Sequence, residues 1–101
     1  MLSILRKILK LLEKLEGLEM DEKLVVKVAK LMTELLGTAF KLDIISLVVN
    51  EIGYNKLAKL ANTSAGAIKT AIDRGSIGDE LSYKIFYGLA KNKPQLLRFA
   101  F

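Results

Sequence analysis

Apolar residues recur every three or four positions along nearly the whole chain, and this spacing predicts α-helices rather than strands. The first part of the pattern predicts helices over residues 3–16 and 22–36. Gly17 and Gly37 follow them as stop signals, and Asp21 is placed to N-cap the second helix. Because the connection between these helices is short, we expect them to form an antiparallel hairpin.

Both helices of this hairpin carry apolar faces that the hairpin alone is unable to bury. One surface that could cover them is the remainder of the same chain. The other is the hairpin of a second copy, which would form a four-helix dimer bundle. A third interpretation, a basic amphipathic helix on a membrane surface, is disfavoured by the acidic residues on the polar face. The pattern leaves the first two alternatives open.

Five more helices are predicted downstream, over residues 39–52, 56–61, 65–74, 80–91 and 94–99. The first of these has few polar residues, so we expect it to be buried on nearly all sides. Asn55 and Asp79 are expected to N-cap the second and the fourth. The chain end is strongly apolar, with Leu96, Leu97, Phe99 and Phe101, so we expect this tail to dock on the hairpin or on a partner subunit.

The segment from Asn55 to Gly75 is predicted to form two short helices joined by a tight turn. Asn62 can end the first helix, because Asn enters the left-handed region of backbone conformation at low cost. Thr63 or Ser64 can N-cap the second helix with a side-chain oxygen. The second helix has an apolar inward face, formed by residues three and four positions apart: Ile68, Ala71 and Ile72.

This segment resembles the helix-turn-helix of the phage Cro and repressor-like DNA-binding proteins. An Ala in the first helix and an apolar triad in the second fall at matching offsets, at Ala58, Ile68, Ala71 and Ile72. The ending Ile72-Asp73-Arg74-Gly75 is also similar to that of the family. There are two departures: Asn62 replaces the usual turn glycine, and the second helix begins with Ser64-Ala65-Gly66 rather than with long polar side chains.

The resemblance implies an all-α protein in which a helical hairpin precedes a Cro/repressor-like helix-turn-helix domain of four to five helices. It implies sequence-selective binding of double-stranded DNA by a homodimeric repressor, paired through residues 1–37, the C-terminal tail, or both. The second helix of the motif, about 65–74, would enter the major groove, with Lys69 and Thr70 at base edges. The full set of implied DNA contacts is Ser64, Ala65, Gly66, Lys69, Thr70, Asp73, Arg74, Lys56, Lys59, Ser76 and Tyr83, with Ser82 as a further backbone contact.

Charge is distributed unevenly between the two domains that we expect, residues 1–37 and 38–101. The chain of 101 residues has a net charge of +5. Residues 1–37 carry seven Lys and Arg against six Asp and Glu, whereas residues 38–101 carry nine against five. The positive excess therefore accompanies the segment that resembles a DNA-binding motif, as contact with phosphate requires.

The composition argues against several other classes of function. The chain has no Cys and no His, which removes thiolate chemistry, the commonest general base and the commonest metal ligand. It carries no phosphate-binding glycine loop and no nucleophile elbow. We therefore expect no enzyme, no metal and no cofactor. The apolar runs are too short to span a membrane, and no signal peptide is evident, so we expect a cytoplasmic, nucleoid-associated protein.

Two alternatives to a sequence-selective regulator stay open. The chain could be a protein-interaction module that keeps the helix-turn-helix shape without binding DNA, as its apolar hairpin and tail allow. It could also be a non-specific architectural DNA-binding protein, because the second helix of the motif has mostly small side chains. Salt dependence and preference among DNA sequences distinguish the three interpretations.

Overall fold

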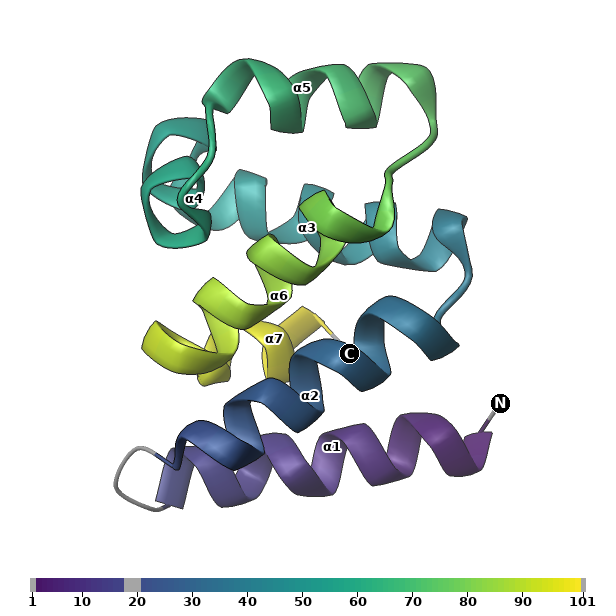
Figure 1. Cartoon of the computed structure of the whole chain (residues 1–101), viewed down its shortest axis with the longest axis vertical. Coiled ribbons are helices and arrows are strands. Elements are labelled where there is room, and N and C mark those ends of the chain that lie inside the picture. Colours follow the sequence, from purple (N-terminus) through teal and green to yellow (C-terminus); the bar gives the residue numbers. More distant parts are fainter. Residues whose placement is uncertain (1, 18–20, 101) are drawn as a thin grey trace.

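The fold is known from a computed structural model, which describes residues 2–17 and 21–100. The described residues form α-helices joined by short connections, so the expected all-α fold is confirmed (Figure 1). The helices are α1 (Leu2–Gly17), α2 (Glu22–Leu35), α3 (Thr38–Ile52), α4 (Tyr54–Ala61), α5 (Ala65–Arg74), α6 (Asp79–Asn92) and α7 (Pro94–Ala100).

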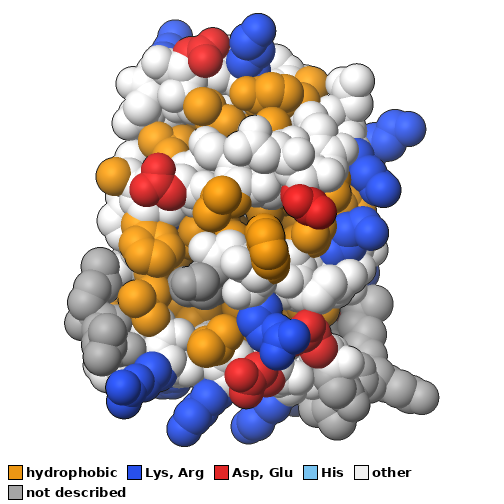
Figure 2. All heavy atoms as spheres, turned by 180° about the vertical axis from the view of Figure 1, so that it is seen from behind, with side chains coloured by type: hydrophobic (Ala, Val, Ile, Leu, Met, Phe, Trp, Pro, Cys, Tyr) orange, Lys and Arg blue, Asp and Glu red, His pale blue; other side chains and the backbone are white. Residues whose placement is uncertain are grey.

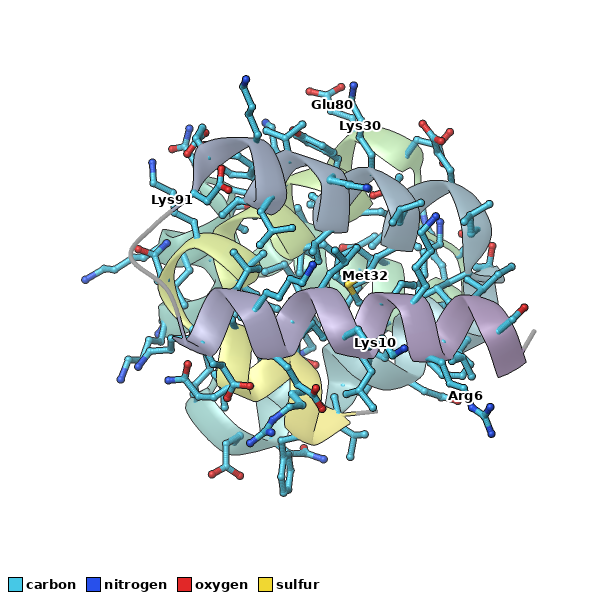
Figure 3. The ribbon with its side chains drawn as sticks, turned by 90° about the horizontal axis from the view of Figure 1, so that it is seen from below. Arg6, Lys10, Lys30, Met32, Glu80 and Lys91 are labelled. Atoms are coloured by element: carbon cyan, nitrogen blue, oxygen red, sulfur yellow. The ribbon has the colours of Figure 1, made fainter. Side chains whose placement is uncertain are left out.

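The helices are arranged around one shared core. In Figure 1, α1 and α2 lie side by side at one end of the molecule and α5 lies at the other, with α6 crossing between them in front of α3. Every helix contributes a buried apolar residue to the core, from Ile8, Val28, Ile44, Leu57, Ile68, Phe86 and Leu97. In Figure 3, Met32 of α2 points into the interior, whereas Arg6 and Lys10 of α1 point to the surface.

The apolar faces of the N-terminal hairpin are covered by the same chain. Within the described part of the chain, α2 and α6 form the most extensive contact between two helices. Helix α1 packs against both α2 and α7. An ion pair joins the hairpin to the chain end, with Arg98 Nε 2.9 Å from Glu16 Oε2. Of the two alternatives left open by the sequence, the structure therefore shows the hairpin folded onto its own downstream helices.

The first helix cap in the described residues follows the sequence prediction, but two later ones do not. Asp21 Oδ1 accepts hydrogen bonds from the backbone N–H groups of Lys23 and Leu24, at 3.1 and 3.4 Å, so its predicted N-cap is confirmed. Asn55 and Asp79 were expected to cap α4 and α6, and both predictions are wrong.

In both cases a glycine occupies the cap position, and the helix begins earlier than expected, by two residues in α4 and by one residue in α6. Gly53 precedes α4 with φ +87°, and its N–H bonds to Val49 O to close α3, so that Asn55 falls inside the first turn of α4. Gly78 precedes α6 in an extended conformation, and Asp79 becomes the first helical residue. There the carboxylate of Asp79 still favours the positive end of the helix dipole.

Two expectations about burial hold only in part. Helix α3 was expected to be buried on nearly all sides, but Leu47 is 45% exposed on its outer face. In the apolar tail, Leu97 is fully buried, whereas Phe99 is 72% exposed. Residues two positions apart on a helix point about 200° apart, so Leu97 and Phe99 are unable to dock on the same surface. Phe101 lies outside the described residues.

A buried lysine joins α3 to the end of α2. Lys41 is almost completely buried, and its Nζ donates a hydrogen bond of 3.0 Å to the carbonyl oxygen of Thr33. That carbonyl lies in the last turn of α2, beyond the internal hydrogen bonds of the helix. The positive charge of Lys41 therefore satisfies a terminal carbonyl and opposes the negative end of the α2 dipole.

Candidate nucleic-acid interface

The turn between α4 and α5 is built by Asn62. This residue has φ 54° and ψ 50°, the left-handed conformation that the sequence predicted. It reverses the chain so that its own N–H group and that of the next residue close α4. Asn62 N donates to Lys59 O at 3.3 Å, and Thr63 N donates to Ala58 O at 3.0 Å. Asn62 therefore ends α4 in the way that a glycine commonly does.

Helix α5 is capped at both ends by local chemistry. At its start, Ser64 Oγ accepts a hydrogen bond of 3.1 Å from Ala67 N, so Ser64 rather than Thr63 is the N-cap. At its end, Gly75 has φ 70°, and the N–H groups of Gly75 and Ser76 bond back to carbonyls of the last turn. The observed bounds, Ala65–Arg74, coincide with the range predicted from the sequence.

The inward face of α5 is the apolar triad identified in the sequence. Ile68 is fully buried, Ala71 is buried, and Ile72 is half-buried against the core. This face packs on α4 and on α3. The opposite face of α5 is consequently turned to the surface, at the end of the molecule farthest from the hairpin (Figure 1).

Nine of the eleven residues predicted to contact DNA are exposed: Lys56, Lys59, Ser64, Gly66, Lys69, Thr70, Asp73, Arg74 and Ser76. They come from α4, from the N-cap of α5, from α5 itself and from the loop that follows α5. We call these nine residues the α4–α5 surface. Its composition is four cationic side chains and one carboxylate, with small or hydroxyl side chains between them.

The two remaining predicted residues, Ala65 and Tyr83, are half-buried against the core. Tyr83 lies over hollows that α6 shares with α2 and with the end of α4, and we leave it out of the surface. Ser82, expected as a backbone contact, is fully buried and donates a hydrogen bond of 2.9 Å to Gly78 O. Position 82 faces inward on α6, which the helical pattern alone could have indicated.

The charges of the α4–α5 surface are available to a ligand. Within the described residues, Lys56, Lys59, Lys69 and Arg74 form no ion pair. Asp73, which follows Ile72 and precedes Arg74 in the chain, also forms no ion pair within the described residues. A surface with a net positive charge and no internal neutralisation attracts a polyanion.

A hollow lies beside this surface, between the end of α4 and α6. It has a volume of about 370 Å³, and its walls include Leu60–Asn62 on one side and Tyr83, Tyr87 and Lys91 on the other. Tyr87 donates a hydrogen bond from its hydroxyl to a carboxylate oxygen of Glu22 in α2. This hydrogen bond, with smaller contributions from burial and from nearby negative charge, raises the pKa of Tyr87.

The sequence did not reveal this hollow, although one residue indicated that another backbone approaches α6 closely beside it. Gly88 lies in the middle of α6, within an otherwise regular helical pattern. A Cβ at that position would overlap the carbonyl group of Leu60 in α4. A glycine inside a helix commonly marks a close approach of another backbone, and here it lets α4 cross directly over α6.

The described residues contain no group of three or more acidic, His or Cys side chains that could hold a metal ion. Within the same residues, no helix combines the length and apolarity needed to cross a membrane. Comparisons with protein-family models, with curated proteins and with solved structures found no match to this chain. The features of this chain that bear on its function are therefore the geometry and charge of the α4–α5 surface.

Proposed function

We propose that this chain is a sequence-selective double-stranded DNA-binding protein that regulates transcription, most simply as a repressor that occludes its site. The observation that carries the proposal is the helix pair closed by Asn62 and Ser64, which presents the outer face of α5 together with four cations that form no ion pair within the described residues. In this proposal the pair is a helix-turn-helix of the Cro/repressor-like kind, and α5 is its recognition helix.

The leading end of α5 is suited to close approach. Gly66 has no side chain, and Ser64 is small and already engaged in capping the helix. The first N–H groups of a helix also attract phosphate, because they lie at the positive end of the helix dipole. These features favour entry of the N-terminal half of α5 into a major groove, whose width admits a helix.

The longer side chains then divide into two roles. Lys69 and Thr70 lie on the exposed face of α5, where an ammonium group can donate to guanine and a threonine can bond to a base or touch a thymine methyl group. Lys56 and Lys59, exposed on α4, would contact phosphates and fix the orientation of the protein. Occlusion of a promoter by such a complex requires no catalysis.

A homodimer is part of the proposal, because one ten-residue helix contacts few base pairs and paired half-sites extend the recognised sequence. Most apolar residues of the hairpin are buried within the chain, although Leu35 is 44% exposed, so the C-terminal tail, with Phe99 72% exposed, is the better contact. Leu47 of α3 and Phe99 of α7 are exposed apolar residues, and these helices lie on the side of the molecule seen in Figure 2. Apolar atoms gather across the middle of that view.

A non-specific architectural DNA-binding protein is the second candidate. It is favoured by the small side chains of Ser64, Gly66 and Thr70, which offer few hydrogen bonds to base edges. It shares the phosphate contacts of the first proposal but not its preference among sequences. A protein-interaction module, the third alternative, is supported by the exposed apolar residues Leu35, Leu47 and Phe99.

The test is selection of binding duplexes from a random-sequence pool, followed by fluorescence anisotropy of the selected duplex against unrelated competitor DNA. A regulator should prefer its selected duplex by at least about a thousandfold. Lys69→Gln and Thr70→Ala should each reduce this preference by about tenfold or more, since a good base contact contributes roughly 1–3 kcal/mol of discrimination.

Lys27→Gln is the matched control for Lys69→Gln, because Lys27 is an exposed lysine of α2 on the other side of the molecule. This control should leave the preference unchanged. Binding with no preference after selection would favour the architectural protein. Absence of binding at low salt would refute both DNA-binding candidates and favour a protein partner.

A further inference from the structure

The hollow between α4 and α6 has the size and the lining of a small-molecule site. Its volume of about 370 Å³ falls within the range of ligand pockets, and one wall is formed by Leu60, Ala61 and Asn62 at the end of α4. We propose that this hollow binds a nucleotide, with the nucleobase against the ring of Tyr83 and the phosphate at Lys91 and Lys84. This inference does not depend on DNA binding by the α4–α5 surface.

The two tyrosines form a fixed aromatic surface. Their ring centroids are 5.8 Å apart and their planes differ by 25°, so the rings are stacked along one side of α6. The hydroxyl of Tyr87 is held by Glu22, which fixes the ring from the α2 side. Packing against Tyr87 orders the ring of Tyr83 before binding, which favours stacking of a nucleobase, because little side-chain freedom is lost.

The charged side chains that line the hollow are both lysines, which selects for an anion. Lys91 Nζ lies 5.7 Å from the centroid of the Tyr87 ring, so a ligand stacked near the tyrosines is within reach of this ammonium group. Lys84 lies between the hollow and Glu80, with 3.7 Å between the charged atoms. Neither Glu80 nor Glu22 is among the lining residues. In Figure 3, Glu80 lies beside Lys30, well separated from Lys91.

The end of α4 supplies acceptors for the polar edge of a base. The N–H groups of Asn62 and Thr63 donate hydrogen bonds to the carbonyls of Lys59 and Ala58. The carbonyl of Ala61 lies beyond these two acceptors, at the C-terminal end of α4. Ala61 lines the hollow, and a terminal carbonyl of this kind can accept a hydrogen bond from an exocyclic amino group. Gly88 borders the hollow where the backbones of α4 and α6 are in contact.

The experiment is a titration of the full-length ¹⁵N-labelled protein with AMP, followed by NMR. We expect the largest shift changes at Leu60–Asn62 and along α6 from Tyr83 to Asn92. Lys91→Gln should weaken binding by about tenfold, the loss of one phosphate contact. Tyr83→Leu, which keeps an apolar side chain but removes the ring, should weaken it by a similar factor. Lys27→Gln is the control for charge and should leave the affinity unchanged.

Further titrations separate the sources of this chemistry. Adenosine and inorganic phosphate should each bind more weakly than AMP, since each lacks half of the ligand. A single-stranded adenine tetranucleotide that binds more tightly at the same residues would identify the nucleobase as part of a strand. Shift changes spread over the exposed lysines, equal weakening by Lys27→Gln, or no change at millimolar AMP would overturn the proposal.

Discussion

Gly88 and Gly66 show that a helical glycine is explained by its neighbours. Both lie within helices, where glycine is less stable than alanine by roughly 0.5–1 kcal/mol. A Cβ at Gly88 would lie 2.7 Å from the carbonyl carbon of Leu60, whereas a Cβ at Gly66 would meet nothing within 4 Å. Packing therefore requires glycine at position 88, and packing within this chain does not require it at position 66.

We predict opposite effects of the same substitution at these two positions. Gly88→Ala should lower the free energy of unfolding by about 1–3 kcal/mol, because α4 must move away from α6. Gly66→Ala should raise it by roughly 0.5–1 kcal/mol through helix propensity. Urea denaturation of both variants provides the measurement. A neutral Gly88→Ala would contradict the close crossing of the two helices.

Local contacts of side chains with the nearby backbone were the most predictable part of the structure. Asp21, Asn62 and Ser64 each act within four residues of their own position, and each has the predicted role. The role of Gly88 depends on Leu60, which is distant in sequence, and it was missed. Lys41 would likewise be assigned to the solvent by its charge, but the structure buries it against the end of α2.

At the scale of helices, the sequence predicted which segments are helical and roughly where each helix ends, but it misplaced the first residues of α4 and α6. The expected capping residues Asn55 and Asp79 are suitable by type. A glycine directly precedes each of these two helices, however, and the helix begins there without a side-chain cap. Residue type alone is unable to distinguish a cap from a residue of the first turn.

Alanine substitutions at Ser64 and Asn55 test this distinction. Ser64→Ala removes the hydrogen bond from Ala67 N and should lower the free energy of unfolding by about 1 kcal/mol. Asn55→Ala removes no cap and should change it by less than about 0.5 kcal/mol. Thermal or urea unfolding of both variants is the check. Equal losses from the two substitutions would mean that Asn55 caps α4 after all.

The hydrogen bond between Tyr87 and Glu22 joins α6 to α2 and gives stability a dependence on alkaline pH. Because this bond raises the pKa of Tyr87, the folded protein holds the phenolic proton more strongly than the unfolded chain does. The contribution is fully present below the ordinary tyrosine pKa near 10.0 and is lost as the pH rises through the higher folded value.

Above pH 10.0, the stability of the parent should therefore fall more steeply than that of Tyr87→Phe, which has no phenolic proton to lose. Urea unfolding at several pH values up to the alkaline limit of solubility measures the two slopes. Glu22→Gln, which keeps a hydrogen-bond acceptor but removes the charge, should reduce the difference. Parallel slopes for the parent and Tyr87→Phe would show that the bond does not perturb Tyr87.

At the scale of the whole molecule, one core joins segments that the sequence presents as separate. The apolar stripes of residues 1–37 are compatible with packing inside the chain or between copies, and periodicity gives no means of choosing. The choice depends on which distant faces fit together, here α2 with α6 and α1 with α7. For the same reason, the docking of Leu97 and the exposure of Phe99 follow from the position of α7 rather than from its composition.

Because this core is shared, we predict that residues 38–101 alone do not fold cooperatively. Removing residues 1–37 would expose the face of α6 that α2 covers and would eliminate several fully buried side chains, among them Ile8, Leu12 and Met32. Circular dichroism during thermal unfolding should show a broad transition for the fragment and a sharp one for the full chain. A sharp transition of the fragment would instead establish it as an independent domain.

The most direct test of the DNA-binding proposal is the salt dependence of duplex binding, measured by fluorescence anisotropy. The logarithm of affinity should fall linearly with the logarithm of salt concentration, because phosphate contacts release counterions. The double variant Lys56→Gln/Lys59→Gln should reduce the magnitude of this slope by about two, and Lys23→Gln/Lys27→Gln on the hairpin should leave it unchanged. No binding at low salt, or an equal reduction by the hairpin variant, would contradict the assignment of DNA binding to the α4–α5 surface.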